Sequence, residues 1–331
     1  MRMSQILGRR WRAKEAQREA QREAASHQLL LRASYIRQHA AGIYSYLHLG
    51  LRSLRKIEAI VRQEMDRSGA QEILMSVVHS ADVWKRTGRY DEVDETLVRF
   101  KDRKRRDMLL AMTHEEIVAE LASSDIRSYR DAGVVVYQIQ TKFRDELRTR
   151  GGLLRTREFI MKDAYSLHLD EDGMAEAYRT QAKAYERIFQ RLGLRDVHKI
   201  RSATGVMGGS VAHEFMCLLD VGEDTVAFCQ ACGDAWNTDV AQGERCDTCG
   251  SEALLRRGVE VGNIFQLCTR YTDALGVSAT ARDGLPPLSG HGLLRDRDQP
   301  APCHASRAAP RQARNRLDGC HGQLRCPPSS C

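Results

Sequence analysis

The stretch that most constrains the fold is residues 141–166, which reads TKFRDELRTRGGLLRTREFIMKDAYS. The run that leads into it alternates with the period of two that is typical of a β-strand. A short loop with two glycines follows, and a second strand-like run returns. The sequence therefore predicts an antiparallel hairpin over 134–162. In its first strand, apolar and polar side chains point to opposite faces: Val135, Tyr137, Ile139 and Phe143 to one, and Gln138, Gln140, Lys142, Arg144 and Glu146 to the other.

The polar face of this hairpin carries groups that suit a nucleoside triphosphate. Arg144 and Glu146 share a face of the first strand, and Arg155, Arg157 and Phe159 share a face of the second. Guanidinium groups donate to phosphate oxygens in a planar geometry, and an aromatic ring offers a surface on which adenine can stack. Taken alone the set is ambiguous, because surface arginines are usually solvated and a strand phenylalanine usually belongs to the core.

Several separated blocks of the chain support the nucleotide interpretation. The hairpin resembles motif 2 of class II aminoacyl-tRNA synthetases, in the form found in bacterial prolyl-tRNA synthetases. The resemblance covers roughly residues 1–285 and implies an α+β fold in which helices flank an antiparallel sheet. The further blocks that read as this family, in its order, are MRMSQILGR at the start, the segment 25–75, AMTHEE at 111–116, MGGSVAHEFM at 207–216 and VEVGNIFQLCTRYTDALG at 259–276.

The resemblance implies ATP with Mg²⁺, proline and tRNA(Pro) as ligands, and a homodimer. It assigns catalytic roles to Arg144 and Glu146. It also implies a substrate role for Thr113, whereas a Thr-x-x-Glu pattern taken by itself is more often a helix capping box. Proline binding is implied for Thr113, Glu115, Arg144 and His213, and ATP binding for Arg144, Glu146, Arg155, Phe159, Gln266 and Thr269.

Four cysteines form a separate motif, CQAC-x13-CDTC. Two CxxC pairs at this separation can place four thiolates around Zn²⁺. The motif lies where long bacterial members of the family carry an editing domain, but only about thirty residues are present, so we expect a structural zinc in a mini-insertion. The ligands are Cys229, Cys232, Cys246 and Cys249.

The segment after Leu285 does not resemble the family. It is rich in Pro, Arg and Cys and lacks periodicity, and Pro300 and Pro302 would oppose strand pairing. The family's motif 3 belongs here, and His291–Pro300 can be back-translated so that a shift of one base reads Met-Gly-Tyr-Tyr-Gly-Ile-Gly-Ile-Asn-Arg. We interpret the tail as out of frame, and expect it to be disordered and the ligase activity to be impaired because motif 3 and the anticodon-binding domain are missing.

The residues before the tail contain no proline: all seven prolines of the chain lie at 286 or later. Ser76 stands where the family keeps an interface proline, so we expect weakened dimerisation. Two explanations are consistent with this bias. One is selection for a synthetase that can be made when charged proline tRNA is scarce, and the other is decay of a gene copy.

The overall composition is that of a globular protein, with 42% apolar and 29% charged residues. No run approaches the ~18 apolar residues of a membrane span, and the N-terminus lacks the apolar core of a secretory signal, so a cytoplasmic location is expected. The net charge of +7 suits tRNA and equally suits a solvated basic surface. Two alternatives to an active ligase remain: a non-catalytic paralogue or remnant, and a zinc-ribbon module that binds nucleic acid.

These patterns give the following expected organisation. The domains are a catalytic core over 1–228, the zinc ribbon over 229–252, a return to the core over 253–285 and the tail over 286–331. Helices are predicted over 10–40, over 50–68, from an N-cap at Thr113 and over 173–192, and strands over 71–78, around the basic turn within 94–112, and near 196–203, 212–219 and 259–267.

Overall fold

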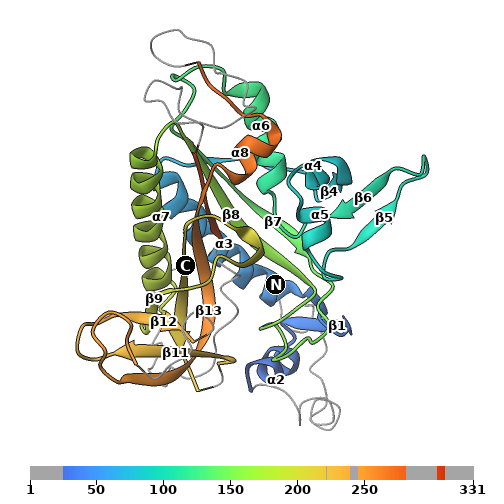
Figure 1. Ribbon diagram of the computed structural model, residues 1–331. Helices are drawn as coiled ribbons and strands as arrows, with labels where there is room; N and C mark the ends of the chain where they lie inside the picture. Colours follow the sequence, from blue (N-terminus) through green and yellow to red (C-terminus); the bar gives the residue numbers. More distant parts are fainter. Residues whose placement is uncertain (1–24, 221, 239–244, 281–303, 310–331) are drawn as a thin grey trace, which may run out of the picture.

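The computed structural model describes residues 25–220, 222–238, 245–280 and 304–309. Within them a nine-stranded sheet forms the centre, in the order β10-β9-β12-β11-β13-β14-β8-β7-β3 (Figure 1). Its neighbours pair antiparallel except for β3 with β7 and β12 with β9. The strands are β3 (Gln71–Glu72), β7 (Val134–Phe143), β8 (Glu158–His168), β9 (Val197–Arg201), β10 (Val211–Leu218), β11 (Asp224–Cys229), β12 (Ala235–Asn237), β13 (Ala253–Cys268) and β14 (His304–Ala309).

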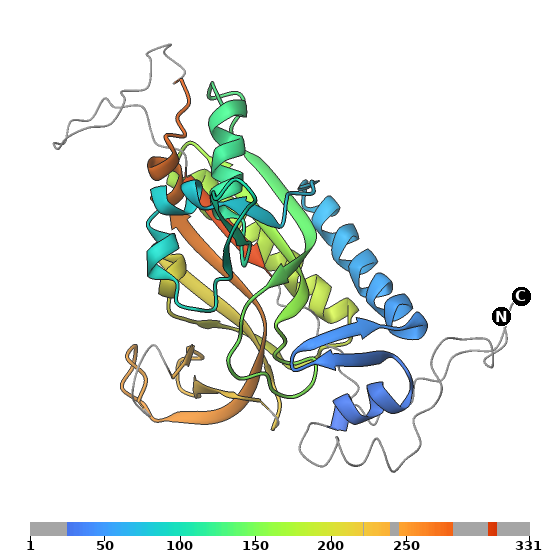
Figure 2. The same ribbon diagram turned by 90° about the vertical axis from the view of Figure 1, so that its right-hand side faces the viewer.

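Two smaller sheets and a set of helices complete the described fold. The hairpin β1–β2 and helix α2 lie together at one end of the molecule, near the start of α3 (Figure 2). The second small sheet has the order β4-β6-β5. The bounds are β1 (Ile36–Ala40), β2 (Ile43–Tyr46), β4 (Val78–Ser80), β5 (Arg99–Lys101), β6 (Asp107–Leu110), α2 (Ala25–Arg32), α3 (His48–Arg67), α4 (Ala81–Arg86), α5 (Arg89–Glu92), α6 (Glu115–Asp125), α7 (Glu171–Arg191), α8 (Arg270–Leu275) and a 3₁₀ turn at Gly205–Met207.

The long helices α3 and α7 cover one face of the central sheet because each has an apolar stripe (Figure 1). Their buried side chains pack on apolar residues of β7, β8, β10 and β13. The two helices are also joined by Glu64 of α3, a buried carboxylate that accepts from Arg187 and Arg191 of α7 at 2.6 and 2.8 Å. Both arginines lower the pKa of Glu64.

The other face of the sheet is covered by α4, α6 and α8, and we call it the site face. Apolar side chains from these helices form one core with Tyr165 and Leu167 of β8 and Phe265 and Leu267 of β13. Between this core and the hairpin loop, the site face carries polar side chains that are fully buried, among them Gln138, Lys142 and Asp163. Polar groups therefore take the place of apolar core residues in this part of the sheet.

The β7–β8 hairpin has the predicted alternation. Gln138 is opposite Asp163, and Lys142 is opposite Phe159, so all four side chains belong to the site face. Tyr137 belongs to the face covered by α3 and α7. The prediction of an antiparallel hairpin and of an α+β fold is therefore confirmed.

Other expectations differ from the structure in detail. The predicted strand over 71–78 appears as two separate strands, β3 and β4, in different sheets. Helix α6 begins at Glu115 and its cap residue is His114, so Thr113 does not cap the helix. Of the helical segment expected over 10–40, α2 is described, while residues 1–24 lie outside the described part. No helix among the described residues is long and apolar enough to cross a membrane.

The tail also differs from expectation. Residues 304–309 form β14, which pairs antiparallel with β13 on one side and β8 on the other. The expectation that the tail contributes no strand is therefore wrong at these six residues. Backbone hydrogen bonding explains the pairing, since β13 and β8 each present donors and acceptors that any extended segment can satisfy. Pro300 and Pro302 lie outside the described residues.

Candidate active site and metal centre

Arg144 lies directly after β7, at the mouth of the hairpin loop. Its backbone N–H donates to the carbonyl of Arg157 at 2.8 Å, which extends the hairpin beyond the strands. Its guanidinium carbon lies 5.4 Å from the centroid of the Phe159 ring. Phe159 is only 7% exposed, so Arg144 covers a ring that is otherwise part of the interior. The structure thus brings together two of the predicted ATP-binding residues.

The other predicted ATP-binding residues of the loop pair with each other. Arg155 donates from Nε and Nη2 to one oxygen of Glu146, at 3.0 and 2.8 Å. A second ion pair joins Arg157 to Asp145 in the same loop. The side chain of Arg155 is 47% exposed, and solvated pairs of this kind contribute little stability. The loop therefore presents arginines that can exchange a carboxylate for a phosphate at small cost.

The predicted proline-binding pair lies deeper, around a buried arginine. Arg89 of α5 donates to Thr113 Oγ1 at 3.0 Å, to Glu115 Oε2 at 3.1 Å and to Glu116 Oε1 at 2.9 Å. Thr113 and Glu115 are 1% and 2% exposed. The Arg89 guanidinium also lies 4.5 Å from the ring centroid of Trp84. Arg89 thus fixes the hydroxyl and both carboxylates in one place.

One cation faces two carboxylates in this cluster. Burial alone would lower the pKa of Arg89, but Glu116 and Glu115 raise it, so Arg89 stays charged. Burial raises the pKa of Glu116, and Arg89 opposes that shift. Removing Arg89 would leave buried carboxylates without a cation, which is costly.

A second buried polar network connects this cluster to the hairpin. Lys142 of β7 donates to Asp163 Oδ2 at 3.1 Å, with its Nζ 3.0 Å from Oδ1, and contacts His114 Nδ1 at 2.5 Å. Tyr165 donates from its hydroxyl to Asp163 at 2.7 Å and accepts from the backbone N–H of His114 at 2.9 Å. His114 stands between Thr113 and Glu115, and Lys142 stands two residues before Arg144. The network therefore holds the two halves of the site in register.

Two buried histidines complete the support. The Nε2 atoms of His79 and His114 both lie within hydrogen-bonding distance of the Ser76 carbonyl, at 2.9 and 2.8 Å. Trp84 donates to the other nitrogen of His79 at 3.1 Å. Burial lowers the pKa of His79 to about 4 and, together with Lys142, that of His114 to about 3. Both rings are therefore neutral near pH 7, donating from Nε2 and accepting at Nδ1.

Two predicted residues are placed elsewhere. His213 of β10 shares a face with Ile264 and contacts the hydroxyl of Tyr178 in α7 at 2.6 Å, so it packs against the helices α3 and α7. This corrects the prediction for His213: alternation in β10 directs the side chain away from the site face. Gln266 lies between Phe265 and Leu267, and since their side chains belong to the site face, the Gln266 side chain is directed to the opposite one.

Thr269 lies at the margin of the buried cluster. It precedes α8 without capping it through its side chain, and its carbonyl accepts from Asp273 at 2.8 Å. Tyr271, two residues on, places its ring 5.7 Å from the Arg89 guanidinium. Thr269 therefore begins the helix whose Tyr271 ring reaches Arg89.

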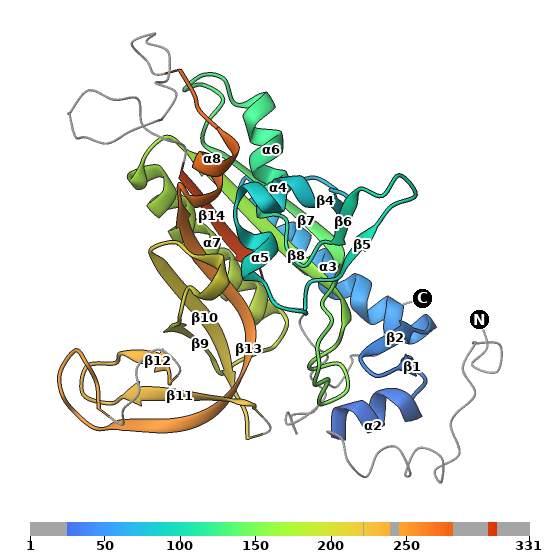
Figure 3. The ribbon, with the colours of Figure 1, turned by 45° about the vertical axis from the view of Figure 1, so that its right-hand side comes forward.

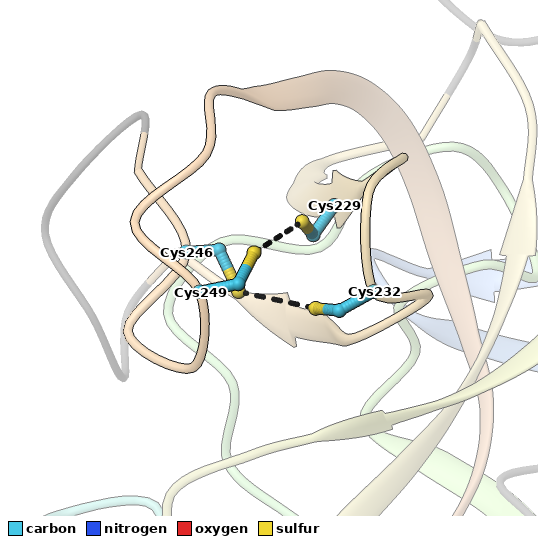
Figure 4. A group of neighbouring side chains, drawn as sticks. All are labelled: Cys229, Cys232, Cys246 and Cys249. Carbon is cyan, nitrogen blue, oxygen red and sulfur yellow. Dashed lines mark hydrogen bonds between the residues drawn. The ribbon is translucent and has the colours of Figure 1, made fainter.

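The four predicted zinc ligands converge at the tip of the ribbon formed by β11, β12 and the start of β13 (Figure 4). Their sulfur atoms all lie within 4.8 Å of one another. The distance is 3.3 Å between Cys229 and Cys249 and 3.6 Å between Cys232 and Cys246. A tetrahedral zinc thiolate site with Zn–S of about 2.3 Å needs sulfurs about 3.8 Å apart. The donor set and its spacing therefore fit Zn²⁺.

The tip of the ribbon is joined to β9 of the central sheet by a short polar bridge. Asp234, two residues after Cys232, accepts from Arg201 of β9 at 2.7 Å and from Thr248 Oγ1 at 2.9 Å. Thr248 lies between the cysteines of the second pair. One carboxylate thus links both CxxC pairs to β9.

Comparisons with known proteins identify the family of this chain. A family model described as the tRNA synthetase class II core domain (G, H, P, S and T) matches residues 98–285. The chain belongs to the class II tRNA synthetase core family. It is 50% identical over 243 residues to a proline–tRNA ligase of Nitratidesulfovibrio vulgaris strain Hildenborough, covering 73% of this chain and 42% of that protein. It is 49% identical over 229 residues to a proline–tRNA ligase of Halothermothrix orenii, covering 69% and 40%.

Solved structures show the same fold. A Giardia lamblia prolyl-tRNA synthetase in complex with prolyl-adenylate aligns with a TM-score of 0.65 and 15% identity, over 84% of this chain and 48% of that one. A Cryptosporidium parvum prolyl-tRNA synthetase complexed with L-proline and AMP aligns with a TM-score of 0.64 and 13% identity, over 86% and 48%. This class II core thus spans less than half the length of the relatives it matches.

In this synthetase core, sequence patterns did not indicate Arg89, His79 or the role of Lys142. The period-two pattern did place Lys142 on the face of Arg144, and that signal could have nominated it. Nothing near Arg89 in the sequence distinguishes it from a surface arginine, because its burial depends on contacts with residues 24–27 positions away.

Proposed function

We propose that this chain carries the catalytic core of a proline–tRNA ligase, which activates proline with ATP and transfers it to tRNA(Pro). Similarity to proline–tRNA ligases at about 50% identity supports the substrate class. The observation that carries the proposal is the buried contact between His114 and Lys142. It joins the segment of Thr113 and Glu115 to the strand that presents Arg144.

The proposed reaction uses these groups for binding and charge stabilisation. Thr113 and Glu115 accept from the secondary ammonium of proline. The proline carboxylate attacks the α-phosphorus of ATP, a new P–O bond forms, and the bond to the β-phosphate breaks with release of pyrophosphate. Arg144 stabilises the charge that develops on the α-phosphate, and Mg²⁺ accompanies the β- and γ-phosphates. A ribose hydroxyl of the tRNA then takes the prolyl group and AMP leaves.

The buried arginine is compatible with proline binding. Arg89 donates to one oxygen of Glu115, and a carboxylate offers about four acceptor positions, so it can accept from an ammonium as well. Arg89 also fixes Glu116 and thereby holds the start of α6. In this proposal Arg89 is a positioning residue, and Glu115 is the group that meets the substrate.

The ribbon is proposed to hold one structural Zn²⁺ through its four cysteines. Cys229 and Cys246 are buried, and Cys232 and Cys249 are exposed. Four protein thiolates would complete a tetrahedron and leave no position for a substrate, which is the pattern of a structural site. The bound metal would close the insertion and fix the start of β13, the strand that continues into the core.

The remaining proposals concern assembly and location. Homodimerisation would use the surface around β3 and β4, where the Leu74 side chain is 75% exposed. Ser76 in this surface would make the dimer weaker than with a stiffer proline. A cytoplasmic location follows from the proposed reaction, since charged tRNA is consumed by translation.

Proline-dependent exchange of pyrophosphate into ATP tests the proposed function. We expect exchange that needs proline and is not supported by alanine or threonine. Proline-independent exchange, or none in a frame-corrected chain, would favour the non-catalytic remnant. Zinc-dependent tRNA binding that survives removal of residues 1–225 would favour the nucleic-acid module.

A further inference from the structure

The hairpin β5–β6 extends away from the body of the molecule (Figures 1 and 3). Its tip, residues 102–107, reads DRKRRD. Four consecutive basic residues therefore occupy the most distant part of the arm, and all four are exposed. We call residues 99–110 the basic arm.

The turn at the tip is held in one conformation by its first residue. Asp102 Oδ1 accepts from the backbone N–H groups of Lys104 and Arg106 at 2.8 and 2.9 Å. The Arg105 N–H donates to the Asp102 carbonyl at 3.0 Å. This is a turn followed by a left-handed residue, a common way to close a hairpin. The basic side chains thus project from a defined scaffold.

The acidic residues of the arm do not neutralise its tip. Asp102 pairs with Arg106 at 2.6 Å, and Asp107 pairs with Lys101 and Lys85 at 2.6 and 2.9 Å. Both carboxylates are thus fully engaged. Arg103, Lys104 and Arg105 have no ion pair among the described residues. Three unneutralised cations remain on consecutive residues.

One of these cations is kept at a conformational cost. Arg105 has φ of +63°, in the left-handed region that glycine adopts freely and other residues avoid. A glycine at this position would close the same turn without strain. The turn geometry therefore does not explain the arginine, and its exposed charge is the property that glycine would lack.

We propose that the tip of the basic arm binds the phosphate backbone of tRNA, an inference that rests on the proposed ligase function. Guanidinium and ammonium groups bind phosphate oxygens regardless of base identity. Three adjacent cations on a rigid turn suit a polyanion with regularly spaced charges better than a single anion. The arm would position tRNA and would take no part in adenylate formation.

The test compares two variants with equal charge loss. In the arm variant Arg103, Lys104 and Arg105 become glutamine, and in the control variant Arg52, Arg55 and Lys56 of α3, which are also exposed, become glutamine. Binding of a tRNA(Pro) transcript to the full chain is measured by fluorescence anisotropy between 50 and 200 mM KCl. The slope of log K against log salt should become less negative by about 2–3 in the arm variant, with ~10-fold or greater loss of affinity, because each phosphate contact contributes about 0.9.

The control variant should keep most of its slope and affinity. Equal changes in tRNA affinity and in its salt dependence in the two variants would show that binding depends on net charge and not on the arm. That result would overturn the inference. Anionic lipid vesicles serve as a second probe, and binding of the arm to vesicles with no effect on tRNA would also overturn it. The proposed ligase function has a separate readout: proline-dependent pyrophosphate exchange, measured in the frame-corrected chain, should be the same with and without the arm substitutions. Normal pyrophosphate exchange in a protein that does not bind tRNA would overturn the proposal for the basic arm and leave the proposed ligase function standing.

A single substitution sharpens the test. Arg105→Gly removes the strain and one charge together. We expect the melting temperature to rise by about 2–4 °C, while tRNA affinity falls severalfold. Unchanged affinity would show that Arg105 does not contact the RNA.

Discussion

The Nζ atom of Lys142 lies 2.5 Å from Nδ1 of His114, and both side chains are fully buried. Since the pKa of His114 is lowered to about 3, its ring is neutral and Nδ1 accepts from the lysine ammonium. Asp163 supplies the opposite charge at 3.0 Å. The relationship fixes the strand of Arg144 against the segment of Thr113 and Glu115, so the geometry of the proposed site depends on an ion pair beneath it.

Replacing Lys142 by methionine should therefore be severely destabilising. Asp163 would remain buried without its cation, a change that costs about 3–5 kcal/mol. Lys101→Met is the matched control, because Lys101 also pairs with an aspartate but its side chain is 57% exposed. It should cost no more than ~1 kcal/mol. Urea unfolding of both variants gives the comparison, and equal losses would mean that the buried pair is not a special support.

Local patterns predicted the parts of the fold and site that depend on nearby residues. The alternation of β7 and the helical stripe of α3 both identify which face is buried, and the CxxC spacing identifies the four cysteines that converge. The role of His213 came from the resemblance and not from alternation in β10, and its side chain contacts Tyr178 on the face covered by α3 and α7. Arg89 was missed because its partners come from other elements.

Arg144→Ala should lower proline-dependent pyrophosphate exchange by ~10²-fold or more, since it removes a donor that acts on the transition state. Measured in a frame-corrected chain, the loss should appear mainly in kcat. Arg148→Ala, an exposed arginine of the same loop, is the control and should change exchange little. Exchange unaffected by the Arg144 change would show that its assignment is wrong.

Cys246→Ser should abolish binding of one zinc ion per chain. The sulfur of Cys246 lies 3.6 Å from that of Cys232, so its loss opens the tetrahedron. Atomic absorption on purified protein measures the metal, and Cys217→Ser, a buried cysteine outside the ribbon, is the control. We expect residues 229–252 to lose protection from hydrogen exchange while β7 and β8 keep it. Equal zinc in both variants would reject the site.

Stability should fall as the pH drops from 6.5 to 5. His79 and His114 have folded pKa values of about 4 and about 3, below the ordinary 6.5. The unfolded chain therefore binds protons in this range and the folded chain does not, so their contribution is complete above 6.5 and declines as the pH falls. Each should account for on the order of 1–2 kcal/mol by pH 5. The free energy of unfolding, measured with urea at each pH, should depend less steeply on pH in His79→Gln than in the wild type. An identical pH dependence in the two proteins would show that His79 does not cause the loss of stability.

The part of the fold that sequence reasoning got wrong, β14, leads to the last prediction. This strand lies between β13 and β8, near the middle of the sheet, where its backbone completes both ladders. We propose that shifting the reading frame before His291 would supply a segment reading Met-Gly-Tyr-Tyr-Gly-Ile-Gly-Ile-Asn-Arg, whose apolar and β-branched residues suit a central strand and whose arginine adds a second cation for the nucleotide. Residues 304–309 occupy the position with the sequence HASRAA and satisfy backbone groups of both neighbours. The 331-residue chain should therefore show weak ATP affinity and exchange lower by at least ~10²-fold than the frame-corrected chain. Both proteins are compared at equal concentration, with circular dichroism to establish that each is folded. Comparable exchange rates from the two folded proteins would show that the tail as given is sufficient for adenylate formation.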